Sequence, residues 1–213
     1  MYNLIMFGPP GAGKGTQAKI ISKRLGIPAI STGEIIRSAI KTGTPMGLAA
    51  REYTEAGKLV PDEVVIGIIK ERLAEDDCQN GFILDGFPRT IPQAEALAEM
   101  GIEITKVISF EVSDDAIVDR MSGRRLCSAC SASYHVKYAP SKVEGKCDSC
   151  GAELIIRKDD REDVVQSRLV TYHHETEPLK AFYDKMGLLA VVDGEGDVEK
   201  VSESAFKALG GEL

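Results

Sequence analysis

The chain has 213 residues, 43% of them hydrophobic, which is enough for one α/β domain with insertions or for two small domains. Its net charge of -7 disfavours a nucleic-acid or membrane partner that is held by bulk electrostatics. No run of 18 apolar residues predicts a membrane-spanning helix, and the first residues lack the features of a secretory signal. We therefore expect a cytoplasmic protein.

The first predicted strand covers residues 3–7 and leads directly into the glycine-rich sequence GPPGAGKGT. Glycines at positions 8, 11, 13 and 15 let the backbone curl with its N–H groups inward, as a nest for phosphate oxygens. The following helical pattern, 16–25, adds the positive end of a helix dipole, and Lys14 can place a charge on the outer phosphates. This order of strand, loop and helix predicts a phosphate-binding loop. The match to G-x-x-x-x-G-K-[ST] is imperfect, because Gly15 stands where the hydroxyl residue belongs and Thr16 follows it.

Strand and helix patterns alternate along the rest of the chain. Further apolar runs predict strands at 27–30, 82–84, 107–110 and 188–192. Helical patterns follow at 34–42, 46–57, 62–75, 91–99, 114–122, 162–186 and 197–209. Continuous apolar runs are typical of strands that are buried on both faces of a parallel sheet. The predicted fold is a doubly wound α/β core with a parallel sheet.

Two stretches interrupt this alternation. Residues 31–60 predict helices only, entered through Ser31 or Thr32 as N-cap, whereas residues 123–160 are polar and rich in turns. We expect both to be insertions in a core. The expected core comprises residues 1–30, 61–122 and 161–213.

Four of the five cysteines form two C-x₂-C pairs in the second insertion, Cys127 with Cys130 and Cys147 with Cys150. Sixteen residues separate the pairs, a spacing that predicts a structural Zn²⁺ site. His135 could replace a ligand, but four thiolates already complete a tetrahedral shell. Cys78 stands alone and is expected to be a small buried hydrophobic residue.

Charged residues mark the ends of the predicted segments. Asp85 follows the strand 82–84, where a carboxylate in a phosphate-loop protein holds Mg²⁺; a helix cap is the alternative. Arg89 lies at the same sheet edge, where open α/β sheets bind ligands. Further arginines lie near the insertions: Arg37, Arg120, Arg124, Arg157 and Arg168. For each alone, a solvated surface charge is the alternative.

The chain has no obvious catalytic base. It lacks Gly-x-Ser-x-Gly and His-Glu-x-x-His, and His173 and His174 have no set of carboxylates or cysteines at ligand spacing, so we interpret both as structural. A phosphate acceptor is already ionised near neutral pH and needs positioning and charge neutralisation, not a base.

Together these motifs resemble the adenylate kinase family over about residues 1–194. The segments that carry the resemblance are GPPGAGKGTQA, STGEIIR, EAGKLVPDE, GFILDGFPRTIPQAE, VDRMSGRR, YHVKYAP, KVEGKCDSCG and RKDDREDVVQSRLVTYH. The resemblance is to the long form, in the subset whose lid, here residues 123–160, holds four cysteines around zinc. It implies the reaction Mg·ATP + AMP ⇌ 2 ADP, closure of the lid and of an AMP-binding insertion, 31–60, and a monomer.

The resemblance also implies roles for individual residues. ATP would be held by Gly11, Ala12, Gly13, Lys14, Gly15, Thr16, Arg124, Ser133, Tyr134 and the backbone of Gly196. AMP would be held by Thr32, Arg37, Lys58, Leu59, Val60, Gly86, Phe87, Pro88, Arg89, Gln93, Arg157 and Arg168. The catalytic set would be Lys14, Arg89, Arg124, Arg157 and Arg168, with Asp85 organising Mg²⁺. The bond between Phe87 and Pro88 is expected to be cis.

Two alternatives stay open. The acceptor could be UMP, CMP or GMP, although the carboxamide of Gln93 can pair with an adenine edge in both directions. The chain could also be a zinc-knuckle nucleic-acid binder with a nucleotide switch. Its pI of about 5.1 and its lack of aromatics interleaved with basic residues, apart from Tyr134 and Tyr138, argue against that function.

Overall fold

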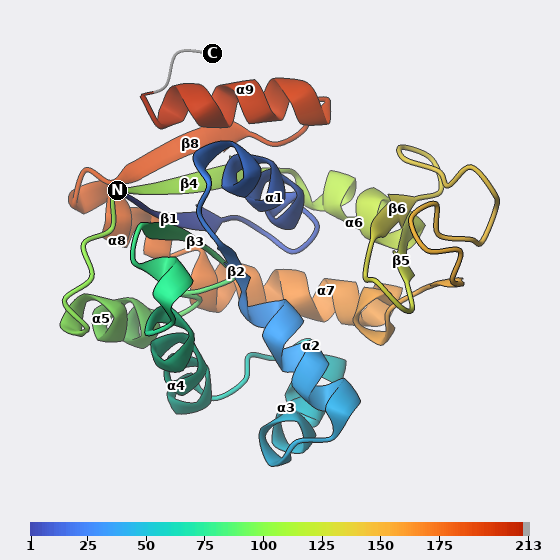
Figure 1. Ribbon diagram of the computed structural model, residues 1–213, viewed down its shortest axis with the longest axis horizontal. Coiled ribbons are helices and arrows are strands. Elements are labelled where there is room, and N and C mark those ends of the chain that lie inside the picture. The colour runs from blue at the N-terminus through green and yellow to red at the C-terminus, as the bar shows by residue number, and fades with distance from the viewer. Residues whose placement is uncertain (211–213) are drawn as a thin grey trace.

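The computed structural model describes residues 1–210 and contains a central sheet of five parallel strands in the order β2-β3-β1-β4-β8 (Figure 1). The strands are β1 (Tyr2–Phe7), β2 (Ala29–Ser31), β3 (Gly81–Asp85), β4 (Lys106–Glu111) and β8 (Leu189–Asp193). Each strand coincides, to within two residues at either end, with the apolar run that predicted it. The predicted α/β fold with a parallel sheet is therefore confirmed.

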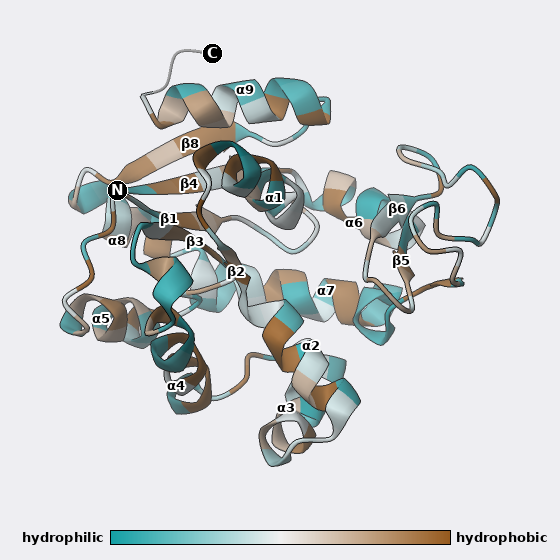
Figure 2. Ribbon diagram, in the orientation of Figure 1, coloured by the Kyte–Doolittle hydropathy of each residue, from teal (hydrophilic) through white to brown (hydrophobic). Residues whose placement is uncertain are grey.

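Alternate residues of the central strands enter two separate cores. On β1, Ile5 and Phe7 belong to one core, while Leu4 and Met6 belong to the other, and all four are at most 3% exposed. The first core is covered by residues of α4, α5 and α8, and the second by residues of α1, α6, α7 and α9. Figure 2 shows the corresponding concentration of hydrophobic residues along the sheet.

Nine α-helices lie within the described residues, seven of them close to their predicted ranges. They are α1 (Lys14–Leu25), α2 (Thr32–Thr42), α3 (Pro45–Glu55), α4 (Asp62–Leu73), α5 (Ile91–Glu99), α6 (Asp114–Gly123), α7 (Glu162–Thr171), α8 (Leu179–Lys185) and α9 (Val198–Ala208). Two short 3₁₀ helices, Asp76–Cys78 and Lys158–Asp160, are also present.

The prediction of one helix over 162–186 was wrong. This segment divides into α7, a π-helical turn at Tyr172–Thr176 and α8. Pro178 lacks an N–H group and cannot donate to a carbonyl one turn earlier. The N–H of Glu177 instead bonds to the carbonyl of Tyr172, five residues back, at 2.8 Å.

Two groups of elements stand away from the sheet in Figure 1, α2 with α3 and a small second sheet. The second sheet is antiparallel and consists of β5 (Arg124–Cys127), β6 (Ser133–His135) and β7 (Leu154–Ile155). The turn-rich sequence here gave no prediction of these strands. None of the helices between residues 1 and 210 has the length and apolar character needed to cross a membrane.

Candidate active site

The loop between β1 and α1 is shaped by glycines at positions that another residue could not occupy. A Cβ atom on Gly8 would lie 2.5 Å from the carbonyl oxygen of Phe110. Gly13 has φ of 91°, in the left-handed region, and ends the loop where α1 begins at Lys14. The N–H groups at the start of α1 and its dipole therefore face the end of this loop, which suits phosphate.

The ammonium group of Lys14 folds back over the loop. It donates hydrogen bonds of 2.7 Å to the carbonyls of Gly8 and of Pro9. Burial lowers the pKa of Lys14 to about 8, although the carboxylate of Asp85 acts in the opposite direction. Among residues 1–210, no carboxylate forms an ion pair with Lys14 within 4.0 Å, and a polyphosphate would provide a direct counter-ion.

Asp85 ends β3, directly beside β1, because Met6 pairs with Asp85 in the sheet. A Cβ atom on Gly15 would lie 3.3 Å from Oδ2 of Asp85. The position where the phosphate-loop pattern has a hydroxyl residue is therefore close to a carboxylate. A hard cation such as Mg²⁺ prefers oxygen ligands, and Asp85 offers them next to the loop.

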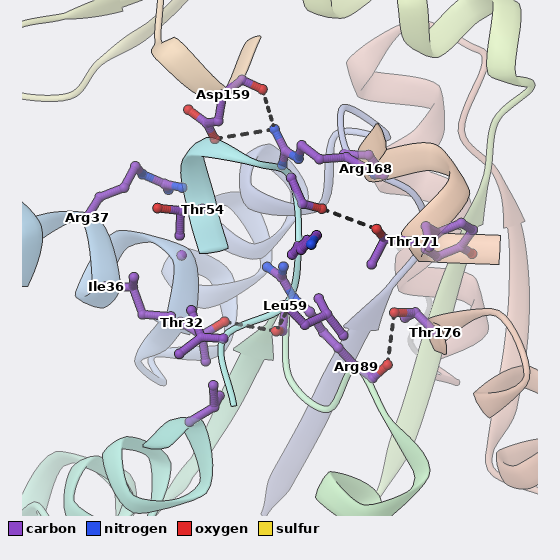
Figure 3. A pocket seen from close by; sticks show the side chains of 18 of the residues that line it. Thr32, Ile36, Arg37, Thr54, Leu59, Arg89, Asp159, Arg168, Thr171 and Thr176 are labelled. Atoms are coloured by element: carbon purple, nitrogen blue, oxygen red, sulfur yellow. Dashed lines mark hydrogen bonds and ion pairs between the residues drawn. The ribbon is translucent and has the colours of Figure 1, made fainter. Parts of the chain in front are cut away.

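A cavity of about 510 Å³ extends from this loop past α2 and the segment after α3 to the segment after β7 (Figure 3). Twelve of the residues to which the resemblance gives a role line it: Lys14, Thr32, Arg37, Lys58, Leu59, Val60, Gly86, Pro88, Arg89, Gln93, Arg157 and Arg168. They come from α1, α2, the segments after α3 and β3, α5, the segment after β7, and α7. The fold thus brings distant parts of the sequence to one cavity.

Cations outnumber carboxylates in and around this cavity. Burial, together with neighbouring arginines, lowers the pKa values of Arg157 and Arg168 to about 10. The pKa of Arg89 is lowered by burial too. In Figure 3, Arg37, Arg89 and Arg168 project from different elements toward the same space. Such clustered guanidinium groups suit bidentate binding of phosphate oxygens.

Two adjacent carboxylates hold the arginines that flank the lid. Nε of Arg124 donates to Oδ2 of Asp160 at 2.7 Å, and Nη1 of Arg168 lies 3.3 Å from Oδ2 of Asp159. Burial alone would raise the pKa of Asp159, but Arg168, Arg37 and Arg157 outweigh it and hold that pKa below its usual range. Sequence reasoning missed this role, although the pair directly follows Arg157 and Lys158 in a run of charged residues.

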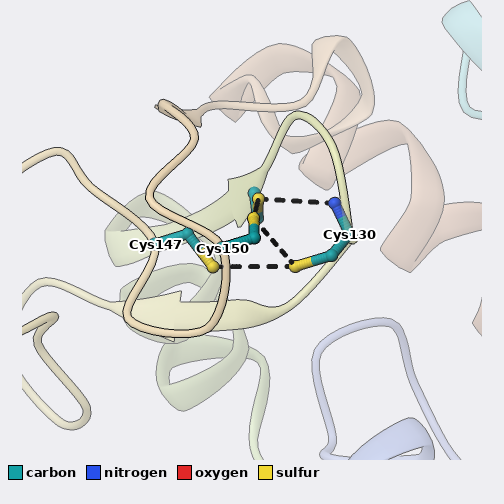
Figure 4. Close-up of side chains that lie close together, drawn as sticks. Cys130, Cys147 and Cys150 are labelled. Carbon is teal, nitrogen blue, oxygen red and sulfur yellow. Dashed lines mark hydrogen bonds between the residues drawn. The ribbon is translucent and has the colours of Figure 1, made fainter.

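The four clustered cysteines form a separate site in the lid (Figure 4). Their sulfur atoms all lie within 4.8 Å of one another, and three of the separations are 3.4, 3.6 and 3.6 Å. Four sulfurs at about 2.3 Å from a tetrahedral Zn²⁺ would be about 3.8 Å apart. The cluster is therefore compatible with zinc.

Comparison with known proteins agrees with this geometry. The family model described as adenylate kinase matches residues 6–188. The chain belongs to the adenylate kinase family. It is 54% identical over 211 residues to an adenylate kinase of Geobacter sp. (strain M21), covering 97% of this chain and 99% of that protein. An adenylate kinase of Caldicellulosiruptor saccharolyticus is 53% identical over 211 residues, covering 97% and 98% of the two chains. Members of this adenylate kinase family are phosphotransferases, so the chain is an enzyme.

Within this adenylate kinase framework, some residues implied by the resemblance do not line the cavity. The peptide bond between Phe87 and Pro88 is cis, as the resemblance implied, but the ring of Phe87 is fully buried in the core. The hydroxyl of Tyr134 lies 3.4 Å from the sulfur of Cys147 and accepts from the N–H of Asp148 at 2.8 Å. Ser133 is exposed on β6, and Gly196 lies between β8 and α9.

Two statements drawn from the sequence need correction, although the structural interpretation of His173 does not. Arg120 does not join the arginines of the cavity but donates to the carbonyl of Gly194 at 2.7 Å. His173 does have carboxylate partners: Nδ1 lies 2.7 Å from Oε2 of Glu177, and Nε2 lies 3.1 Å from Asp114. Both partners raise the pKa of His173, and the hydrogen bond to Glu177 has the larger effect. They connect the π-helical turn to α6, which agrees with a structural role.

One further residue supports the site from the π-helical turn. The hydroxyl of Thr176 donates to the carbonyl of Arg89 at 2.9 Å, while Nε of Arg89 donates to the carbonyl of Gly86 at 2.8 Å. The segment that carries Arg89 is therefore held from both sides. No pattern in the sequence marked Thr176, because its contact spans 87 residues.

Proposed function

We propose that the chain catalyses reversible phosphoryl transfer, Mg·ATP + AMP ⇌ 2 ADP, as its relatives' name indicates. The observation that carries the proposal is one cavity that joins Lys14 of a phosphate loop to a cluster of half-buried arginines. Two polyphosphate ligands would supply the negative charge that this cluster lacks. Because of its family membership, we propose that the enzyme balances the adenine nucleotides of the cytoplasm.

On the donor side, the N–H groups of the loop would bind the phosphates of ATP. Lys14 would exchange its bonds to the Gly8 and Pro9 carbonyls for phosphate oxygens. Arg124, held by Asp160, would bind ATP from the lid. Mg²⁺ carried by ATP would neutralise phosphate charge beside Asp85. The family pattern alone supports adenine contacts by Ser133, Tyr134 and the Gly196 backbone.

On the acceptor side, AMP would lie in the part of the cavity formed by the first insertion and the segment after β3. Arg37 would pair with its phosphate, and Gln93 would pair with its base. The remaining proposed contacts come from Thr32, Lys58, Leu59, Val60 and the segment Gly86–Arg89. Phe87 would contribute through its backbone, since its side chain is 0% exposed.

Transfer itself needs no protein base, because the phosphate of AMP is the nucleophile. Arg89, Arg157 and Arg168 would neutralise the charge on the transferring group as it moves between the nucleotides. Besides burial, neighbouring arginines lower their pKa values in the free enzyme, Arg37 and Arg124 acting on Arg157, and Arg124 and Arg89 on Arg168, so binding of phosphate relieves an existing repulsion.

The test is a coupled assay for ADP formed from ATP with AMP, UMP, CMP or GMP as acceptor. We expect AMP to give the highest kcat/KM by a wide margin. Equal use of another monophosphate would contradict the proposed acceptor, and absence of transfer to every acceptor would contradict the function.

Three further proposals rest on family membership and on the described elements. We propose that residues 31–60 form the AMP-binding insertion, that residues 123–160 form the lid, and that the rest forms the core. We propose that Cys127, Cys130, Cys147 and Cys150 bind structural Zn²⁺. We propose that the chain acts as a monomer without nucleic acid, which light scattering of the purified protein would test.

A further inference from the structure

The side-chain amide of Gln93 has partners of opposite kinds at its two ends. Its Nε2 donates to Oδ1 of Asp62 at 2.7 Å, and its Oε1 accepts from the backbone N–H of Arg89 at 2.8 Å. Gln93 is 1% exposed and lines the cavity of the candidate active site. Asp62 begins α4, and Gln93 belongs to α5, so two helices meet at this contact.

These partners fix which end of the amide is oxygen and which is nitrogen. An ionised carboxylate only accepts hydrogen bonds, and a backbone N–H only donates them. A Gln93 amide turned by 180° would place oxygen against the carboxylate of Asp62 and N–H against the N–H of Arg89. Both contacts would be repulsive, and both buried groups would lose a hydrogen bond.

Asp62 is itself held in place. Its second oxygen, Oδ2, accepts from the hydroxyl of Thr90 at 3.1 Å. The same hydroxyl caps α5 by accepting from the backbone N–H of Gln93 at 3.3 Å. Because Asp62 lies in the first turn of α4, the helix dipole also favours its negative charge.

The fixed amide leaves one N–H on Nε2 and one lone pair on Oε1 for a ligand in the cavity. A 6-aminopurine offers the complementary pair, since its N1 accepts and its 6-amino group donates. A 6-oxopurine offers the reverse, since its N1–H donates and its O6 accepts. In the same pose, the N1–H of a 6-oxopurine would face the N–H of Gln93, and its O6 would face Oε1, so that neither pair could form a hydrogen bond.

We propose that Asp62 is a positioning residue that makes the acceptor site prefer 6-aminopurine over 6-oxopurine monophosphates. The inference rests on the proposed function, because it assigns Gln93 to the base of the acceptor. Asp62 does not touch the acceptor in this arrangement; it acts by making one orientation of the Gln93 amide far more stable than the other.

The test compares AMP with IMP, whose base differs only in the 6-oxo group and the proton on N1. Asp62→Asn keeps the shape and an acceptor for Thr90 but can also donate to a reversed Gln93 amide, so that only the N–H of Arg89 still opposes reversal. We expect the ratio of kcat/KM for AMP to that for IMP to fall about tenfold, since a bidentate base contact carries discrimination of this order. The change should appear in KM for AMP and not in KM for ATP.

Glu63→Gln is the matched control, because it removes the same charge from the same helix turn and Glu63 is exposed. We expect this variant to keep the wild-type ratio. A second readout needs no nucleotide: because Oε1 of Gln93 faces the backbone N–H of Arg89, the nuclear Overhauser effect between that N–H and the side-chain amide protons of Gln93 should be weak in the wild-type protein. In Asp62→Asn it should become stronger, because a reversed amide places its N–H groups against the N–H of Arg89.

An unchanged AMP to IMP ratio in folded Asp62→Asn would overturn the inference, as would equal losses for AMP and IMP, which indicate only a structural role. If Asp62→Asn does not fold, the wild-type protein decides: a weak Overhauser effect between the Arg89 N–H and the Gln93 amide protons supports the inference, and a strong one overturns it. Lack of AMP turnover in the wild type would overturn the proposed function and the inference with it.

Discussion

At the scale of single residues, burial makes the charged form of Lys14 less stable than it would be in water, and a bound nucleotide would stabilise that form. Burial lowers its pKa to about 8 from an ordinary value of 10.5, and two carbonyl oxygens are its only hydrogen-bond partners within the described residues. Phosphate oxygens would favour the charged form and raise this pKa on binding. The free enzyme and the complex should therefore depend on pH differently.

We expect kcat/KM for ATP to decrease as pH rises through about 8, because that parameter reports the free enzyme, in which Lys14 then loses its proton. Lys14→Met should lower turnover at least a hundredfold at pH 7 and remove this pH dependence. Lys70→Met, at an exposed site on α4, is the control. Near wild-type turnover in Lys14→Met would contradict the phosphate-loop interpretation.

Stability of the nucleotide-free protein should depend on pH with the opposite sign. Since the pKa of Lys14 is lower in the folded state, the unfolded chain binds more protons between about pH 8 and 10.5. The contribution of Lys14 to the free energy of unfolding therefore rises with pH across that window. Urea titrations at several pH values should show that this rise is smaller in Lys14→Met and unchanged in Lys70→Met.

The arginines should divide between the two substrates, since Arg37 lies on α2 and Arg124 begins β5 in the lid. Arg37→Ala should mainly raise KM for AMP, and Arg124→Ala should mainly raise KM for ATP, each by about tenfold to a hundredfold for a lost charged contact. Steady-state kinetics with each substrate varied in turn measure this. If either variant weakens both substrates equally, the division is wrong.

At the scale of elements, periodicity predicted the strands and most helices because each burial pattern is local. The apolar run 82–84 became β3, and the glycine-rich loop lies where the strand and helix patterns placed it. The break within 162–186 was missed because the helical pattern continues on both sides of Pro178. The roles of Asp159, Thr176 and Asp62 were missed because their contacts depend on tertiary packing.

The close approach of α2 and α3 depends on Gly47. A Cβ atom at this position would lie 2.1 Å from the carbonyl oxygen of Ala39. Gly47→Ala should therefore push the two helices apart, lower the melting temperature by several degrees and raise KM for AMP. Calorimetry and kinetics would measure both effects.

Gly67 in α4 is the matched control, because a Cβ atom there would have no atom within 4 Å beyond its chain neighbours and the backbone of its own helix. Gly67→Ala should raise the free energy of unfolding by about 0.4–1 kcal/mol, since it restricts the unfolded chain without strain in the helix. Similar effects of the two substitutions would show that helix propensity, not contact between α2 and α3, decides stability here.

At the scale of the whole molecule, the cavity is assembled from segments spread over most of the chain. The sequence could indicate the charged residues of the site, because arginines at segment boundaries stand out in an acidic chain. The sequence could not indicate which of these arginines would lie together. Arg89 and Arg168 both line the cavity, whereas Arg120 donates to the carbonyl of Gly194. Such differences depend on side-chain directions that no local pattern encodes.

The last prediction concerns the cysteine cluster and the lid that contains it. Within residues 123–160, the buried hydrophobic side chains are Leu126, Cys127 and Cys147. A segment with so small a core needs another source of stability, and a metal that joins four side chains supplies it. Four thiolates leave zinc no open position for water or phosphate, so the metal should take no part in the reaction.

Removal of the metal by a chelator should therefore lower the melting temperature and increase hydrogen exchange in residues 123–160, with less change in the core. A thiol reagent should detect four newly reactive cysteines and one metal ion released per chain, and Cys78→Ser should leave the metal content unchanged. Turnover should fall only as far as lid closure is impaired, because Lys14, Arg89 and Arg168 lie outside the lid. Replacement of zinc by cobalt should leave the rate of the chemical step unchanged; a changed rate, or a metal-free lid as rigid as before, would contradict a purely structural metal.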